Sequence, residues 1–166
     1  MAQLRIVHYL SQFTVAKFVS VYLRLALGTA FLSAVADRFG LWAPPGARNV
    51  GWGDFAHFMS YTAQLNPWAP PAVIPVLAWL ATAAETVLGI ALVHGFLPRW
   101  AGLLSGIVIL LFALGMCVGT GVKSALAYSV FSASAAGFAL FASRSPLGSA
   151  TTSAPTSTCS LASTCR

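Results

Sequence analysis

Four long stretches of the chain are almost entirely apolar, and polar residues gather between them. These stretches are residues 18–36, 72–93, 100–118 and 125–143. About 20 apolar residues in helical form are enough to cross the hydrocarbon core of a bilayer. Backbone polar groups in lipid must also be satisfied within the segment that carries them, which favours helix. Each stretch therefore predicts a membrane-spanning helix.

The connections between these spans differ in length and content. Residues 94–99 and 119–124 are short turns, so they predict antiparallel neighbours. Residues 37–71, between the first two spans, are far longer than a typical helix connection. Loops of this length usually carry function or fold on their own.

The long connection contains a helical pattern of its own. Asp54 is a suitable N-cap, and Phe55, Phe58 and Met59 follow at helical spacing. Trp52 lies just before this segment, and tryptophan favours the membrane interface. Residues 54–65 are therefore predicted to form an amphipathic helix that lies on the membrane surface or caps the bundle.

The sequence thus predicts an all-α fold, an integral membrane four-helix bundle spanning residues 18–143. Residues 1–17 precede it and are interpreted as a short segment at the interface. Residues 144–166 are rich in Ser and Thr and poor in apolar side chains. Such a tail has too little apolar surface to fold alone and is expected to be flexible.

Composition excludes several classes of protein. Hydrophobic residues make up 58% of the chain and charged residues only 7%, against about 25% charged residues in soluble domains. A soluble enzyme, a disordered protein and a disulfide scaffold are all excluded on that balance. The net charge of +6 comes from basic residues scattered singly, so no nucleic-acid partner is expected.

The scattered basic residues instead predict an orientation. One side of the membrane would hold more of them than the other, and such residues favour the cytoplasm. The richer side would hold Arg5, Lys17, Arg99, Arg144 and Arg166, and the poorer side Arg38, Arg48 and Lys123. Both termini are therefore predicted to be cytoplasmic.

Two charged residues interrupt the spans, Arg24 in the first and Glu85 in the second. Counted from Lys17 and His94, they lie roughly 10 Å and 13 Å from the same membrane face at 1.5 Å per residue. Because an isolated charge in lipid costs several kcal/mol, we expect an Arg24–Glu85 ion pair. It is either a structural clamp that fixes helix register or a site for a proton, quinone or substrate.

Small residues predict where helices pack closely. Gly28 follows Arg24 by four residues, and Gly89 follows Glu85 by four, which favours pairing of these two spans. Gly102 and Gly106 form a similar pattern in the third span. Their alternative use is oligomerisation through an outer face.

Residues that usually carry chemistry are sparse. No histidine lies in the middle of a span, and no nucleophile, base and acid form a set. His57 lies three residues after Asp54, which suits a hydrogen bond better than a metal site. We therefore predict no catalytic residue, no metal and no intrinsic cofactor, with quinone or lipid as the remaining ligand candidates.

Three segments resemble the DoxX-like family of small bacterial membrane proteins. They are residues 22–28 (YLRLALG), residues 85–92 (ETVLGIAL) and the turn at residues 95–101 (GFLPRWA). Residues 123–141 are also similar to the family's last helix, so the resemblance covers residues 18–142. Where the family often has a lysine after the first span, this chain has Asp37-Arg38.

The resemblance implies a four-helix bundle in the bacterial inner membrane, with Arg24 and Glu85 as the family's charged positions. The family name comes from a relative of a thiosulfate:quinone oxidoreductase subunit. Other members look like membrane partners of thiol-redox or detoxification proteins. Protein partner subunits or further copies of the chain are therefore expected alongside membrane lipid.

Three functions follow from these observations. The first is a non-catalytic accessory or anchoring subunit of a membrane redox assembly, which would not be an enzyme on its own. The second is a quinone-linked oxidoreductase component with its site near Arg24 and Glu85. The third is a small transporter, which would need oligomers because four spans with one polar pair form no pathway alone.

Overall fold

The protein is all-helical in a computed structural model that describes residues 2–143, with side chains described from residue 15 onward. This confirms the predicted fold class. The helices of the described part are α1 (Ala2–Arg38), α2 (Phe55–Leu65), α3 (Ile74–His94), α4 (Pro98–Gly119), α5 (Val122–Ala127) and α6 (Val130–Ala142). The predicted tail, residues 144–166, lies outside the described residues.

Helix α1 is longer than the sequence predicts. It runs without a break from Ala2 to Arg38, so no boundary separates residues 1–17 from the first span. Its sequence contains no proline, and its single interior glycine is Gly28. Nothing in it therefore ends a helix before Arg38.

Among the described residues, three helices are long and apolar enough to cross a membrane, by length and composition: Val15–Arg38 within α1, then α3 and α4. The fourth predicted span is wrong as a single helix. It is divided into α5 and α6 at Tyr128 and Ser129, and Ser129 has the left-handed φ of 54°. Neither glycine nor proline marks this break, which explains why the apolar pattern alone missed it.

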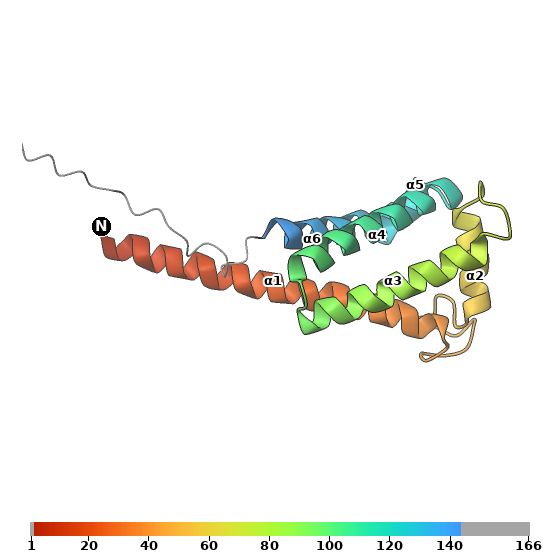
Figure 1. Ribbon diagram of the computed structural model, residues 1–166, viewed down its shortest axis with the longest axis horizontal. Coiled ribbons are helices and arrows are strands. Elements are labelled where there is room, and N and C mark those ends of the chain that lie inside the picture. The colour runs from red at the N-terminus through yellow and green to blue at the C-terminus, as the bar shows by residue number, and fades with distance from the viewer. Residues whose placement is uncertain (1, 144–166) are drawn as a thin grey trace, which may run out of the picture.

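The helices form two pairs, α1 with α3 and α4 with α6, as Figure 1 shows. Glycine permits the close approach in both pairs. Gly28 and Gly89 face each other between α1 and α3. Gly102 and Gly106 of α4 face Gly137 of α6, where each helix backbone is nearly in contact with the other.

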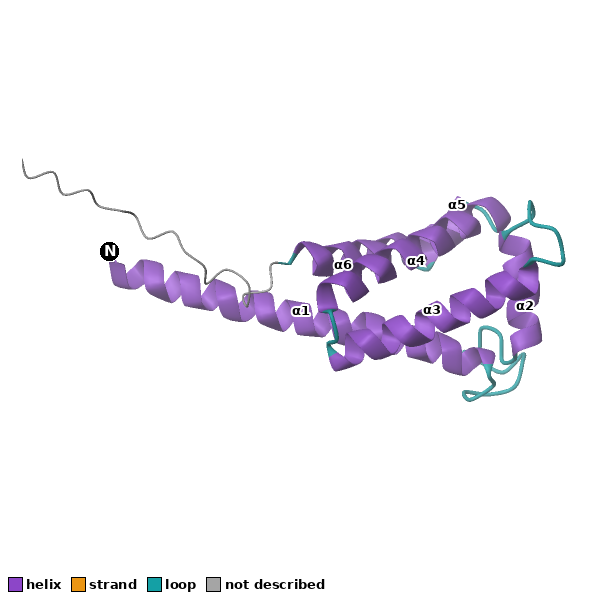
Figure 2. Cartoon of the chain, viewed as in Figure 1, coloured by secondary structure: helices purple, strands orange, loops and turns teal. Residues whose placement is uncertain are grey.

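Helices α3 and α4 share a tight turn and then spread apart (Figure 2). At the turn, Gly95 has φ 76°, and the amide of Phe96 donates to the carbonyl of Ala91 at 2.9 Å, which closes the end of α3. At the opposite end, α2 packs against both helices and buries Phe58 and Leu65. The predicted amphipathic helix thus caps the bundle.

Candidate functional site: a buried ion pair beside an apolar cavity

The most strongly polar contact inside the bundle joins Arg38 to Glu85. The Nη2 atom of Arg38 donates to both carboxylate oxygens of Glu85, at 2.8 and 2.7 Å. The Nη1 atom donates to the hydroxyl of Thr82 at 2.9 Å. The two charged side chains are only 1% and 7% exposed. Burial of this kind is tolerated because the two charges are paired through two hydrogen bonds and Arg38 also donates to Thr82.

Aromatic side chains cover the guanidinium group of Arg38. Its central carbon lies 3.7 Å from the centre of the Phe58 ring and 5.3 Å from that of Trp52. Such contacts are attractive because the face of an aromatic ring is electronegative. Helix α2 and the loop before it therefore close the site from the end of the bundle.

Asp37 holds that loop in place. Its Oδ2 atom accepts hydrogen bonds from the backbone amides of Gly51 and Trp52, both at 3.0 Å. Because Asp37 and Arg38 are adjacent at the end of α1, one helix end fixes both the loop and the ion pair. The sequence predicts Arg38 only as a flanking charge on the side of the membrane with fewer basic residues, and it does not predict these roles of Asp37 and Arg38.

The predicted Arg24–Glu85 pair is wrong. The Nε atom of Arg24 donates to the backbone carbonyl of Leu92 at 3.1 Å, and its guanidinium group lies against Gly95. Arg24 thus satisfies an end carbonyl of α3 and places a positive charge at the negative end of the helix dipole. Glu85 has Arg38 as its partner.

The error comes from the register of antiparallel helices. Gly28 faces Gly89, and Gly89 also contacts Leu32. Moving four residues back from Gly28, to Arg24, leads towards the end of α3. Moving four residues back from Gly89, to Glu85, leads in the opposite direction along α1, towards Arg38. Equal spacing from the two glycines therefore separates Arg24 from Glu85.

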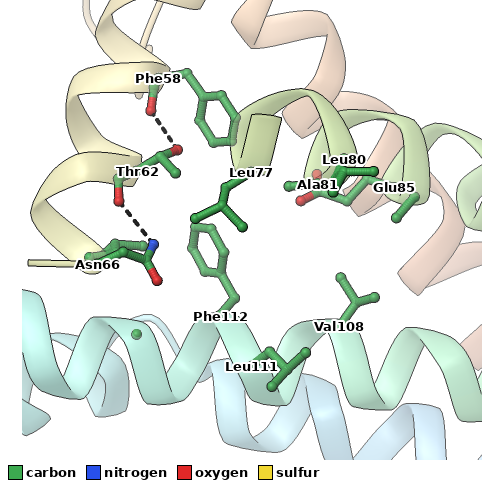
Figure 3. Close-up of a pocket in the computed structure, with 13 residues that line it drawn as sticks. Phe58, Thr62, Asn66, Leu77, Leu80, Ala81, Glu85, Val108, Leu111 and Phe112 are labelled. Carbon is green, nitrogen blue, oxygen red and sulfur yellow. Dashed lines mark hydrogen bonds between the residues drawn. The ribbon is translucent and has the colours of Figure 1, made fainter. Parts of the chain in front are cut away.

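A cavity of about 300 Å³ lies next to the ion pair, between α2, α3 and α4. Figure 3 shows Thr62 and Asn66 of α2 on one side, Glu85 of α3 on another, and Phe112 of α4 below. Most of the lining is apolar. Pockets of this character, with few polar groups, are typical of sites for small ligands.

The cavity reaches the outer surface of the bundle. Two of its lining residues, Leu80 of α3 and Leu111 of α4, are 62% and 64% exposed. Both helices are candidate membrane spans, so these exposed leucines would face the lipid around the bundle. An apolar molecule dissolved in the bilayer would therefore meet this cavity directly.

The predicted cap of α2 has the expected neighbours. The Oδ1 atom of Asp54 accepts hydrogen bonds from the backbone amide and the Nδ1 atom of His57, both at 2.8 Å. The backbone amide of His57, and then its side chain, hold the pKa of Asp54 below its usual range. In the described part of the chain, no three His, Cys, Asp or Glu residues come together as a metal site would need.

The comparisons with known proteins decide the family. The model of the DoxX family matches residues 19–118, which is more than half of the chain. The chain belongs to the DoxX family. No curated protein and no solved structure matches it.

The matched region of this DoxX protein includes Arg38, Glu85 and every residue that lines the cavity. It ends at residue 118, before α5 and α6, so it is shorter than the resemblance seen in the sequence. The family assignment and the apolar helices together place this DoxX protein in a membrane.

Proposed function

We propose that this DoxX protein is a non-catalytic accessory subunit that anchors a partner within a membrane redox assembly. The observation that carries the proposal is the projection of α1 past the end of its own bundle, which Figure 1 makes visible. The redox character of the assembly is taken from the family resemblance. Quinone or lipid as a ligand stays a prediction from the sequence.

The contacts of Arg24 fix where the bundle ends. Arg24 meets Leu92 and Gly95 at the last turn of α3, and Leu23 still packs against the core, so residues 2–22 of α1 lie beyond that turn. At 1.5 Å per residue, they extend for about 32 Å. The side chains of Val15, Phe18 and Tyr22 on this projection are 59%, 72% and 63% exposed.

An apolar face that stays exposed next to a packed bundle, as on Val15, Phe18 and Tyr22, favours a further contact. The α3–α4 turn carries His94 and Arg99, which suit the membrane interface, so the projection leaves the bundle at that level. Exposed apolar patches with this placement are typical of surfaces that meet another protein. With the predicted orientation in a bacterial inner membrane and both termini cytoplasmic, the partner would be met at the cytoplasmic end of the candidate span Val15–Arg38.

Native mass spectrometry of the protein, extracted from its own membrane in mild detergent, tests the proposal. We expect a complex of defined stoichiometry for the unmodified chain. The double variant Phe18→Ser with Tyr22→Ser should lose the complex while remaining folded. The matched control, Val118→Ser with Leu126→Ser, changes two residues that are equally exposed elsewhere and should keep it. A lone monomer from the unmodified chain would refute the accessory role.

A further inference from the structure

The cavity between α2, α3 and α4 is not explained by an anchoring role. We propose that it binds a lipid-soluble phenol whose hydroxyl group donates a hydrogen bond to Glu85. This site is separate from the projecting part of α1, so the two proposals stand or fall independently. Four properties of the cavity carry the inference: its size, its opening, its polar groups and its rings.

Size limits the ligand. The volume of about 300 Å³ lies at the lower end of the range for small-molecule sites. It accommodates one ring with a short alkyl chain and excludes a whole phospholipid. Apolar side chains such as Leu77 and Val108 form most of the wall, so the body of the ligand is apolar.

The opening determines where the ligand comes from. Leu80 and Leu111 line the cavity and are also exposed on the outside of α3 and α4. Because α3 and α4 are candidate membrane spans, a molecule enters between them from the bilayer. A ligand taken from lipid is neutral, since a charged group in hydrocarbon costs several kcal/mol.

The polar groups of the cavity select for a hydrogen-bond donor. The hydroxyl of Thr62 donates to the carbonyl of Phe58, and one of the two amide N–H groups of Asn66 donates to the carbonyl of Thr62, both at 2.9 Å. One free donor thus faces a larger number of acceptor oxygens. Both oxygens of Glu85 accept from Arg38, and a carboxylate oxygen has room for a second hydrogen bond. Since Arg38 balances the charge of Glu85, the site attracts a neutral donor.

Two aromatic rings favour an aromatic ligand over an aliphatic alcohol. Phe58 and Phe112 line the end of the cavity nearest α2, and Figure 3 shows both rings beside Leu77. Aromatic rings that meet in offset or edge-to-face geometry attract each other beyond simple burial. A phenolic hydroxyl is also a stronger donor than an alcohol. The ring and the hydroxyl group together define the proposed class of ligand.

Photolabelling in nanodiscs tests the proposal. The probe is 4-hexylphenol with a diazirine in its alkyl chain, and peptide mapping locates the label. We expect labelling of α3 and α4 around Leu80 and Leu111. Unlabelled 4-hexylphenol should compete at least tenfold better than 4-hexylanisole, which has the same ring and alkyl chain but carries a methyl group in place of the hydroxyl hydrogen and has no donor. Equal competition by the two compounds would overturn the proposal, since the cavity would then accept any alkyl chain.

A matched pair of variants locates the site. Ala84 lines the cavity, whereas Ala83 is exposed and points elsewhere on the same helix. Ala84→Phe fills the cavity without changing the ion pair and should reduce labelling at least tenfold. Ala83→Phe adds the same ring outside the cavity and should leave labelling unchanged. Equal labelling of the two variants would refute binding in this cavity.

A third variant isolates the role of Glu85. Arg38→Leu with Glu85→Leu removes both charges together and leaves neither unpaired. Labelling should persist in this variant, because the apolar walls remain, but the tenfold preference for the phenol over the ether should disappear. A preference that survives would show that Glu85 does not receive the hydroxyl group.

Discussion

The α4–α6 and α3–α4 interfaces share helix α4 but differ in how closely the two helices approach each other. A Cβ atom at Gly102 would lie 2.7 Å from that of Leu140, and one at Gly137 would lie 2.6 Å from the backbone nitrogen of Gly106. Helices α3 and α4 are joined by a short turn, yet α2 and a cavity lie between their far ends. In lipid, small residues therefore determine which helices pack closely, and a short connecting turn matters less.

The largest effect is expected from Gly137→Leu, which breaks the close interface. The new side chain would meet the backbone of α4, and backbone cannot move aside as a side chain can. We expect a loss of about 3 kcal/mol or more in the free energy of unfolding, measured by circular dichroism during titration with a denaturing detergent. Ala135→Leu, on the exposed side of α6, should change it by less than about 0.5 kcal/mol.

Arg38→Ala removes one partner of the charged contact that links α1 to α3. The buried carboxylate of Glu85 would lose both of its hydrogen bonds from Arg38, and we expect a loss of about 3 kcal/mol in the same assay. Replacing both residues with leucine should recover most of that loss, because no charge then remains unpaired. If the double variant were as unstable as the single one, the ion pair would not be the cause.

Arg24→Ala should cost less, about 1 kcal/mol, as expected for a charge at a helix end. Glu85 keeps Arg38 in this variant, so only the contact with the end of α3 is lost. The same detergent titration measures it beside Arg38→Ala. Equal losses for the two variants would mean that Glu85 depends on Arg24 after all.

The smallest effect concerns the cap of α2 and its dependence on pH. The folded pKa of Asp54 lies below its unfolded value, so its stabilising contribution is complete above the unfolded value. It is lost as the pH falls through the folded pKa. The protection factor of the His57 amide against hydrogen exchange, measured by NMR relative to the intrinsic rate at each pH, should therefore fall on acidification. The variant Asp54→Asn keeps a capping oxygen at this position but cannot ionise there. The protection of the His57 amide in this variant should therefore stay constant over the same pH range.

Sequence reasoning succeeds where a signal is local. Apolar length predicted α1, α3 and α4 as spans, and the Asp54 cap with its helical spacing predicted α2 within one residue. The partner of Glu85 was not local, because it depends on the register of two helices distant in sequence. Arg38 lies at the end of a span, which on sequence alone is typical of a solvated flanking charge.

The cavity and the helix break were beyond sequence reasoning for different reasons. The cavity exists because α3 and α4 spread apart around α2, and no spacing along either helix encodes that angle. The break at Ser129 lacks the glycine or proline that usually marks one, and only its left-handed φ reveals it. The same pattern of apolar residues is compatible with one straight helix.

The break between α5 and α6 gives the protein two unequal flanks. Helix α6 has 13 residues and is about 20 Å long, whereas the hydrocarbon layer is about 30 Å thick. Tyr128, at the break, is 75% exposed and has the amphipathic ring that headgroups favour. The bilayer is therefore expected to be thinner beside α6, whereas beside α3 it keeps its ordinary thickness. Such hydrophobic mismatch biases a protein towards thinner regions of its membrane.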